Sequence, residues 1–284
     1  MLSPLPADLD RQIAALAELL RGRRITVLTG AGISTESGIP DYRTPRPGPR
    51  PAPMLHDTFV RDAGARQRYW ARSAAGYPRV GLAEPNAGHR ALVELEREGT
   101  VTGILTQNVD GLHQRAGSQR VVELHGALRR VRCLECGAVV SRDEVQRAIA
   151  RLNPAHPLDG AIRPDGDAAL SESVVSGFVV PVCETCGGVL MPDVVFFGGS
   201  VPKPTVAEAW SLYDDGDALL VVGSSLAVFS GYRFVLRAEK DRQRVALLTL
   251  GQTRADARVA LKVEAPLGAA LPRLAEALHI AASP

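Results

Sequence analysis

Four cysteines form two short pairs that could hold a metal ion. The pairs are Cys133/Cys136 and Cys183/Cys186, with 46 residues between them and no cysteine left over. Each C-x-x-C turn can present two thiolates, and two such turns complete the tetrahedron that zinc prefers. Protein would then fill every position, so the sequence predicts one structural Zn²⁺. A redox pair of the thioredoxin type is the alternative, but both pairs continue into glycine, which lets the chain fold back around a metal.

A second group of polar residues directly follows three apolar runs. The group is Gln107, Asn108 and Asp110 after residues 101–106, His125 after 121–124, and Ser224 and Ser225 after 218–222. Ligands of an open parallel sheet bind beyond the carboxyl ends of its strands. A lone histidine there is usually solvated and an Asn or Asp usually makes a turn, but imidazole is also a good base near pH 7. Because all these residues converge on one sheet edge, the pattern indicates a polar binding site.

Residues 30–43, GAGISTESGIPDYR, begin like the phosphate-binding turn of a dinucleotide fold. Gly30 and Gly32 follow an apolar run, and such a turn places a pyrophosphate at a helix N-terminus. Thr35 replaces the third glycine of G-x-G-x-x-G. The acid that dehydrogenases carry about 20 residues further on is also missing, because position 50 is Arg50. The stretch therefore predicts nucleotide binding for a reaction other than hydride transfer.

The elements that must position these groups follow from the apolar pattern. Strands buried on both faces are expected at 25–29, 101–106, 121–124, 218–222 and 245–250. Helices are expected at 8–21, 55–80, 87–98 and 268–279. This alternation predicts an α/β fold with a doubly wound, Rossmann-like parallel sheet, a smaller zinc-binding domain and an inserted helical segment.

We divide the chain into five segments. They are 1–54, the first part of the Rossmann-like nucleotide-binding domain, with a proline-rich cofactor loop at 44–54; 55–86, a helical insert; 87–126, the second part; 127–191, a zinc-binding module with a long insert at 151–182; and 192–284, the third part.

Composition excludes several classes of protein. The 284 residues are 45% apolar and carry a net charge of +2, so a full core is expected and a broad attraction to DNA or to membranes is not. No apolar run approaches the roughly 18–20 residues that cross a bilayer, and the N-terminus lacks the order of a secretory signal. We expect a cytoplasmic monomer that binds neither nucleic acid nor membrane.

The motifs also occur in the order found in sirtuins, the NAD-dependent protein lysine deacylases, which the chain resembles from about residue 24 to 272. They are GAGIS, GIPDYR, TQNVD, HG, the two cysteine pairs and GSSL. The stretches PDVVFFG and VVGSSLAVFSGYRF resemble the class II branch, that of the mitochondrial lipoamidase and ADP-ribosyltransferase-type sirtuins. The resemblance implies that NAD is a co-substrate and that acyl-lysine proteins or peptides are the partners.

The resemblance also implies the site residues. His125 and Asn108 are expected to be catalytic. NAD is expected to contact Gly30, Ala31, Gly32, Ser34, Glu36, Ile39, Pro40, Asp41, Tyr42, Arg43, Gln107, Asn108, Val109, Asp110, Gly223, Ser224, Ser225, Thr249, Leu250, Gly251 and Leu267. Thr249 stands where the family usually has asparagine, so somewhat weaker NAD binding is expected.

The mechanism implied by the resemblance breaks the bond between nicotinamide and ribose. The acyl oxygen of a modified lysine attacks the ribose carbon to give an alkylimidate. His125 then acts as the base for a ribose hydroxyl that attacks the imidate. Asp110 is expected to hold the carboxamide of nicotinamide, and Asn108 to position water. Water completes the transfer, which yields free lysine and acylated ADP-ribose.

Substrate contacts are expected at two places. Val195, Phe196, Phe197 and Gly198 resemble one of the two edges between which the family's peptides lie as a third strand, and the strand after GSSL resembles the other. Tyr69 and Arg72 lie three residues apart in a predicted helix, and class III sirtuins use this Y-x-x-R spacing to bind the carboxylate of succinyl- or glutaryl-lysine. An exposed helix carrying arginine by chance is the alternative.

Three other functions fit parts of the sequence. A protein ADP-ribosyltransferase uses the same cleavage of NAD. A zinc-ribbon protein that binds nucleic acid is disfavoured by the near-neutral charge, and a silent ADP-ribose sensor is disfavoured by the presence of His125.

Overall fold

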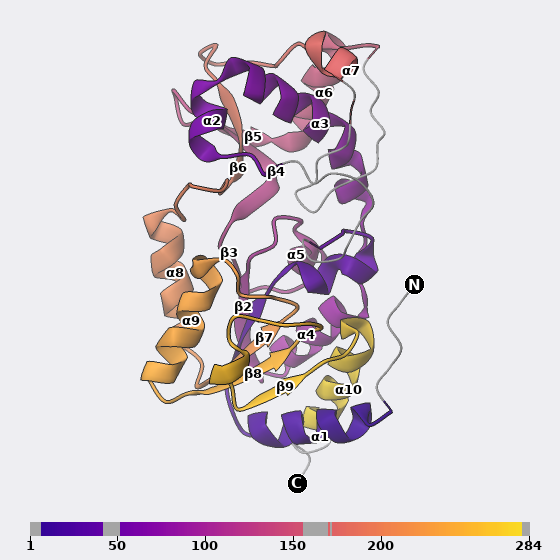
Figure 1. Ribbon diagram of the computed structural model, residues 1–284, viewed down its shortest axis with the longest axis vertical. Coiled ribbons are helices and arrows are strands. Elements are labelled where there is room, and N and C mark those ends of the chain that lie inside the picture. Colours follow the sequence, from indigo (N-terminus) through magenta and orange to yellow (C-terminus); the bar gives the residue numbers. More distant parts are fainter. Residues whose placement is uncertain (1–6, 42–51, 156–169, 171, 280–284) are drawn as a thin grey trace.

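The computed structural model describes residues 7–41, 52–155, 170 and 172–279, and in that part of the chain it contains a parallel and an antiparallel sheet (Figure 1). The parallel sheet has the order β3-β2-β1-β7-β8-β9. Its strands are β1 (Ile25–Thr29), β2 (Val101–Thr106), β3 (Val121–Glu123), β7 (Ala218–Val222), β8 (Arg244–Leu248) and β9 (Leu261–Val263). The chain runs outward from β1 to β3 and then returns to the other side of β1. This is the doubly wound order of a Rossmann sheet, so the expected fold class is confirmed.

Strand β1 lies at the centre of the sheet, and all five of its residues are buried. It pairs in parallel with β2 on one side and β7 on the other. Its continuous apolar run is what burial on both faces requires. The expected strand 245–250 was placed too late, because the structure begins β8 at Arg244 and ends it at Leu248, before the turn at Gly251 with its φ of +71°.

Helices cover both faces of the parallel sheet (Figure 1). One face packs against α1 (Leu9–Leu20), α4 (Ala87–Arg97) and α10 (Leu267–His279), which lie within two residues of expected helices. The other face packs against α8 (Lys203–Asp214) and α9 (Phe229–Lys240). These last two helices were not predicted from the sequence. Helix α8 buries only Ala209, Leu212 and Tyr213, too few apolar positions for a clear helical period.

The antiparallel sheet forms the core of a smaller module at the top of Figure 1. Its strands, in the order β5-β4-β6, are β4 (Gly126–Cys133), β5 (Val139–Ser141) and β6 (Leu190–Val194). Its helices are α2 (His56–Arg61), α3 (Ala63–Leu82), α6 (Arg142–Leu152) and α7 (Glu172–Ser176). Residues from these helices and strands share one apolar cluster that includes Phe59, Trp70, Val131 and Ile149.

The expected helical segment 55–80 is confirmed, but the structure divides it into α2 and α3. The chain breaks at Asp62, whose φ of −109° and ψ of 109° are extended, and α3 continues to Leu82. The Asp62 carboxylate accepts a hydrogen bond from the backbone N–H of Ala65 at 3.0 Å, which caps the new helix.

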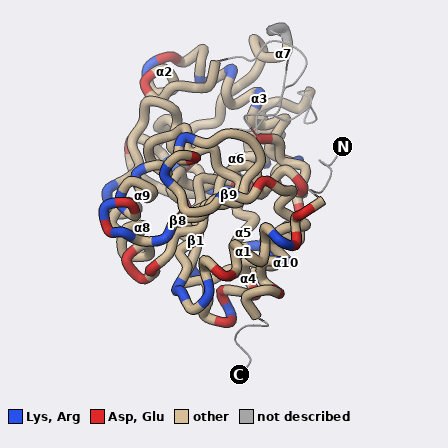
Figure 2. Tube along the Cα trace, turned by 60° about the horizontal axis from the view of Figure 1, so that its bottom comes forward, with Lys and Arg blue, Asp and Glu red and all other residues tan. Residues whose placement is uncertain are grey.

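Short elements complete the described chain: η1 (Ala31–Ser37), α5 (Leu112–Ala116) and η2 (Asp256–Arg258). Most of the proline-rich loop 44–54 and part of the insert 151–182 lie outside the described residues. No helix in the described ranges is long and apolar enough to cross a bilayer. Basic and acidic residues lie side by side around α2, α8 and α9 in Figure 2.

Candidate active site

The phosphate-binding turn lies between β1 and β7, at the point where the order of the strands in the sheet reverses. The backbone N–H of Gly30 donates to Val222 O, and that of Gly32 donates to Gly223 O at 2.9 Å. A Cβ on Gly32 would lie 2.8 Å from both the Cα and the O of Gly223. Only glycine lets these two loops approach so closely, and the short 3₁₀ helix η1 already begins inside the turn, at Ala31. This is the crevice in which doubly wound sheets bind nucleotides.

The Gly32→Ala variant is expected to bind NAD more weakly. The added Cβ would push the two loops apart, and overpacking of this kind costs about 1–3 kcal/mol. If that cost falls on the binding site, the Kd for NAD rises by about 5- to 150-fold. Calorimetric titration with NAD measures the change. Gly81→Ala is the matched control, because nothing lies within 4 Å of its Cβ position; equal Kd values for the two variants would contradict the assignment of the turn.

A buried amide, hydroxyl and carboxylate lie beside this turn. Asn108 donates through Nδ2 to Gly30 O at 3.2 Å and to Ser34 Oγ at 3.1 Å. Ser34 Oγ in turn donates to Asp110 Oδ2 at 2.7 Å. Burial raises the pKa of Asp110, and its hydrogen bonds with the Leu112 N–H and with Ser34 oppose part of that rise. Because Nδ2 is used by Gly30 and Ser34, the Oδ1 of Asn108 remains as an acceptor.

His125 lies between β3 and β4, at the same edge of the sheet. Its Nδ1 lies 2.9 Å from the carbonyl oxygen of Gln107, and its Nε2 lies 2.7 Å from Ser230 Oγ. Burial lowers the pKa of His125, the hydrogen bond to Gln107 opposes this, and the charge of Arg233 lowers it further. The imidazole is therefore neutral at pH 7, as a general base must be.

The glycine after His125 fixes its position. Gly126 has a φ of +78°, and a Cβ there would lie 2.0 Å from the carbonyl oxygen of Asp193 on β6. The backbone N–H of Val195 donates to His125 O at 2.9 Å. The His-Gly pair thus places the imidazole where the small module meets the parallel sheet.

Other predicted nucleotide contacts surround the turn. Ser224 Oγ donates to Gln107 Oε1 at 2.6 Å, so the ends of β7 and β2 are joined. Leu267 Cδ1 lies 2.9 Å from the Cβ position of Gly223. Thr249 is buried at the end of β8. Glu36 is exposed and accepts from the N–H of Gly268, so it connects η1 to α10.

The remaining predicted contacts differ in exposure. Ile39 is buried and Leu250 is exposed. Partly buried positions are Ala31, Pro40, Asp41, Val109 and Ser225. Tyr42 and Arg43 lie outside the described residues.

Two further residues at this site were not identified from the sequence. Ser230 contacts His125, and Asn86 donates through Nδ2 to Ile33 O at 2.7 Å and to Ser37 Oγ at 2.9 Å. Asn86 therefore connects α4 to helix η1. Ser230 lies within the quoted stretch VVGSSLAVFSGYRF, but a serine in that position carries no sequence signal of its own.

The predicted substrate edge runs beside His125. Residues Val195 to Gly198 directly follow β6; Phe196 is buried, and Phe197 is 45% exposed. Phe197 forms a parallel bridge with Leu55. The expected strand after GSSL is wrong: residues 226–228 form no strand, and α9 begins at Phe229. A segment counts as a strand only when it forms ladder hydrogen bonds with a neighbouring strand. In the described part of the chain, residues 226–228 have no such neighbour.

Tyr69 and Arg72 lie on α3. Tyr69 is buried and makes edge contacts with the rings of Phe59 and Phe196, at centroid distances of 5.4 and 5.1 Å. It therefore contacts the predicted substrate edge. Arg72 is partly buried, and its Nε has no hydrogen-bond partner among the described residues.

All four cysteines meet at one point of the small module. Their sulfur atoms lie within 4.8 Å of one another. Cys133 and Cys186 are 3.5 Å apart, and Cys136 and Cys183 are 3.8 Å apart, so each close contact joins one C-x-x-C turn to the other. A tetrahedron with Zn–S bonds of about 2.3 Å has sulfur–sulfur edges of about 3.8 Å. The thiols are free rather than disulfide-bonded, and the donor set fits one structural zinc with no open position.

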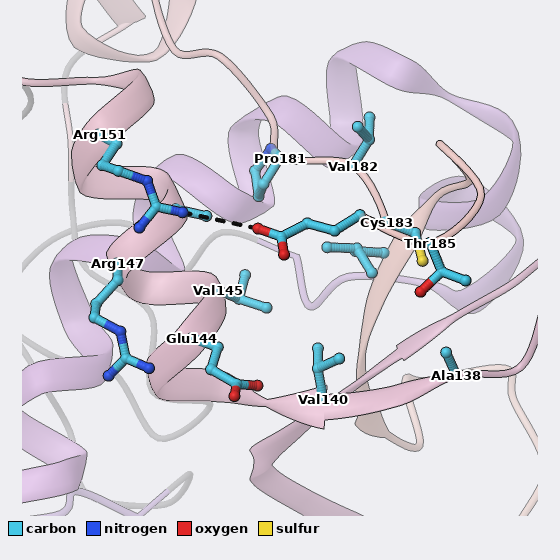
Figure 3. A pocket seen from close by; sticks show the side chains of 13 residues that line it. Ala138, Val140, Glu144, Val145, Arg147, Arg151, Pro181, Val182, Cys183 and Thr185 are labelled. Carbon is cyan, nitrogen blue, oxygen red and sulfur yellow. Dashed lines mark ion pairs between the residues drawn. The ribbon is translucent and has the colours of Figure 1, made fainter.

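A hollow of about 370 Å³ lies on this module, beside α6 (Figure 3). Arg147 and Arg151 of α6 line it together with Val140, Pro181 and Val182. Arg151 forms an ion pair with Glu184 at 3.8 Å. The hollow shares no residue with the nucleotide turn or with His125, so it is not the active site.

The sequence of this chain is similar to those of known proteins. Residues 30–230 match the model of the Sir2 family. The NAD-dependent protein deacetylase of Xanthomonas axonopodis pv. citri is 50% identical, over 92% of this chain and 89% of its own. The NAD-dependent protein deacylase Sirt4 of Drosophila melanogaster is 46% identical, over 90% of this chain and 84% of its own.

Solved structures agree. A Sir2–p53 peptide–NAD+ complex superposes with a TM-score of 0.75 and 29% identity, over 94% of this chain and 98% of its own. Sir2Tm bound to a propionylated peptide superposes with a TM-score of 0.73 and 27% identity, over 93% of this chain and 98% of its own. The chain belongs to the Sir2 family.

Proposed function

We propose that this protein is an NAD-dependent protein lysine deacylase that transfers the acyl group to ADP-ribose. The observation that carries the proposal is the placement of His125. A partly buried, neutral imidazole lies at the same sheet edge as the glycine turn and beside the segment Val195–Gly198. Nucleotide and acylated peptide can therefore meet at one base.

Each residue then has a defined role. The turn Gly30–Gly32 receives the pyrophosphate, because its glycines let a ligand approach the backbone closely, and Asp110 binds the carboxamide of nicotinamide. Nε2 of His125 takes the proton from a ribose hydroxyl, while the Gln107 carbonyl holds Nδ1–H. Asn108 Oδ1 accepts a hydrogen bond from water.

Protein ADP-ribosylation is the second candidate, because the same cleavage of NAD precedes it. The two differ in whether release of nicotinamide depends on an acylated lysine. A panel of acyl-lysine peptides with NAD, in which nicotinamide and free lysine are both quantified, separates them. Nicotinamide release in a one-to-one ratio with free lysine supports deacylation, whereas release without an acyl peptide supports ADP-ribosylation or simple hydrolysis of NAD.

We further propose that the preferred acyl group carries a carboxylate, as in glutaryl-lysine. Tyr69 contacts Phe196 of the substrate segment, and Arg72 follows one turn later on α3. Arg72 Nε is enclosed and lacks a partner in the described part of the chain. A buried donor without an acceptor is costly, and a substrate carboxylate would supply that acceptor through charge-assisted hydrogen bonds.

Arg72→Ala is expected to lose far more activity on a glutaryl peptide than on an acetyl peptide. A carboxylate buried without its partner costs several kcal/mol, about 3–5, whereas a neutral chain has no charge to compensate. The kcat/KM ratio for the two peptides measures the difference. Arg68→Ala is the control, because Arg68 lies one turn earlier on α3 and its contact with Asp62 is a loose surface pair at 3.9 Å. Equal losses on both peptides would show that Arg72 only supports the fold.

The remaining features of the proposal concern the whole molecule. We place the protein in the cytoplasm, where free thiols persist, as a monomer that binds neither nucleic acid nor membrane. The intermixed charges around α2, α8 and α9 support the absence of nucleic-acid binding (Figure 2). Fractionation, light scattering and a gel-shift assay with DNA test these points.

A further inference from the structure

Ser230 and the Gln107 carbonyl hold the two ring nitrogens of His125 from opposite ends. Gln107 O lies 2.9 Å from Nδ1, and Ser230 Oγ lies 2.7 Å from Nε2. A carbonyl can only accept, so Nδ1 carries the proton of the neutral ring. Nε2 is then the acceptor, and the Ser230 hydroxyl must donate to it. The basic nitrogen of His125 is therefore already hydrogen-bonded before any substrate arrives.

The sequence around Ser230 fits this contact closely. Ser230 lies in the first turn of α9, and the next residue is Gly231. A Cβ on Gly231 would lie 2.8 Å from the side-chain carbon and nitrogen of Gln107. The glycine thus allows α9 to approach the end of β2 closely enough for Ser230 to contact His125. The Gln107 side chain is itself fixed by Ser224 at 2.6 Å.

We propose that Ser230 is a positioning residue for His125. Its hydroxyl donates to Nε2, which keeps the imidazole in the tautomer with Nε2 unprotonated and orients the ring, and it gives up its place to the incoming ribose hydroxyl. The ribose hydroxyl and Ser230 use the same lone pair, so the serine occupies the place of the substrate hydroxyl in the free enzyme. The inference rests on the proposed role of His125 as the base.

The effect of nearby charges on His125 can be distinguished from the effect of the Ser230 hydroxyl. Helix α9 contributes Arg233, whose charge lowers the pKa of His125 and whose Nε donates to the backbone oxygen of Ser230 at 3.1 Å. Strand β2 and the segment after β6 contribute Gln107 and Val195, and neither of them titrates. A Ser230→Ala change keeps the backbone oxygen that Arg233 uses. The change therefore removes the hydroxyl and leaves the neighbouring charge in place.

Histidine-labelled protein without ligands tests the contact directly by ¹⁵N NMR, with His125 assigned from the His125→Ala spectrum. The parent is expected to show the tautomer protonated on Nδ1. The Ser230 hydroxyl donates to Nε2 of the neutral ring and can only accept from Nε2–H of the protonated ring, so its loss in Ser230→Ala should shift the pKa of His125, by about 0.4–1 unit. Ser230→Thr keeps a hydroxyl and should restore the parent value. Ser211→Ala, an exposed serine on α8, is the control and should not move it.

The pH profile of deacylation is the second readout. The base works only when neutral, so activity is lost as the pH falls through the pKa of His125. The acid limb of kcat/KM, which reports the free enzyme in which Ser230 still contacts His125, should therefore shift in Ser230→Ala in the same direction and by the same amount as the pKa in the spectra, and return in Ser230→Thr.

The results distinguish the role of Ser230 as a positioning residue from the role of His125 as the base. A parent ring protonated on Nε2, or an unchanged His125 pKa in Ser230→Ala, would overturn the role of Ser230. A pKa that moves in the spectra without a shift in the acid limb would leave the Ser230 contact intact but show that His125 is not the base.

Discussion

The His125→Ala variant is expected to deacylate an acyl-lysine peptide about 10²–10⁴-fold more slowly than the parent, since removal of a positioned general base typically costs this much. The structure explains the size of the loss. Nε2 is an unprotonated nitrogen, held at the meeting point of the nucleotide turn and the substrate segment. Burial keeps the ring neutral at the working pH. Single-turnover rates of lysine release, at saturating NAD, measure the effect.

The same variant should keep its fold and much of its affinity for NAD. Among the described residues, no hydrogen bond joins the His125 ring to the glycine turn or to the Asn108–Ser34–Asp110 network; the ring nitrogens bond to Gln107 and Ser230. His279→Ala is the matched control, because His279 lies at the end of α10 and is 65% exposed. If His125→Ala turned over acyl-lysine as fast as His279→Ala, another group would have to be the base.

The fold could be predicted where the physical signal was local. Strands β1, β2 and β7 are apolar runs buried on both faces, and their predicted bounds agree with the structure. Helix α8 could not be predicted, because it buries few apolar side chains. The break between α2 and α3 depends on one cap, Asp62, inside a continuous helical pattern.

The candidate site could be predicted from residue types at strand ends. Gln107, Asn108 and His125 follow strands whose carboxyl ends share one edge, and topology then brings them together. Ser230 could not be found in this way. It lies on a helix after β7, and only the close packing of α9 against β2, made possible by Gly231, brings its hydroxyl to His125.

The contacts of the substrate segment could be predicted from the sequence only in part. Phe196 and Tyr69 are 127 positions apart, yet their rings contact each other at 5.1 Å. Helix α3 and β6 belong to one apolar cluster that also contains Cys133 and Cys183. The spacing of Tyr69 and Arg72 suggested an acyl pocket, but only the packing of this cluster shows which segment the pocket would face. The zinc site therefore also supports the predicted substrate contacts.

The Cys133→Ser variant is expected to lose most of its zinc and to unfold the small module. A structural zinc contributes about 10–16 kcal/mol of apparent binding free energy in isolated zinc-finger peptides, which is as large as the stability of a whole domain, about 5–15 kcal/mol. Cys133 is buried, and its sulfur lies 3.5 Å from that of Cys186. Loss of one thiolate leaves an incomplete tetrahedron inside the cluster formed by Trp70, Ile149 and Phe196. Zinc content by mass spectrometry and thermal unfolding measure the two effects.

Thr185→Ala is the control variant, because it changes the turn that carries two of the cysteines without removing a zinc ligand. Thr185 lies between Cys183 and Cys186, is exposed, and contributes no sulfur, so this variant should keep one zinc per chain and the parent's unfolding temperature. Activity should fall in Cys133→Ser only as the module unfolds, because four protein ligands leave the metal no position for substrate or water. Parent protein purified with well under one zinc per chain, or a Cys133→Ser variant as stable as Thr185→Ala, would contradict a structural zinc site. A Cys133→Ser variant that kept its fold but lost its chemistry would instead assign the metal to catalysis.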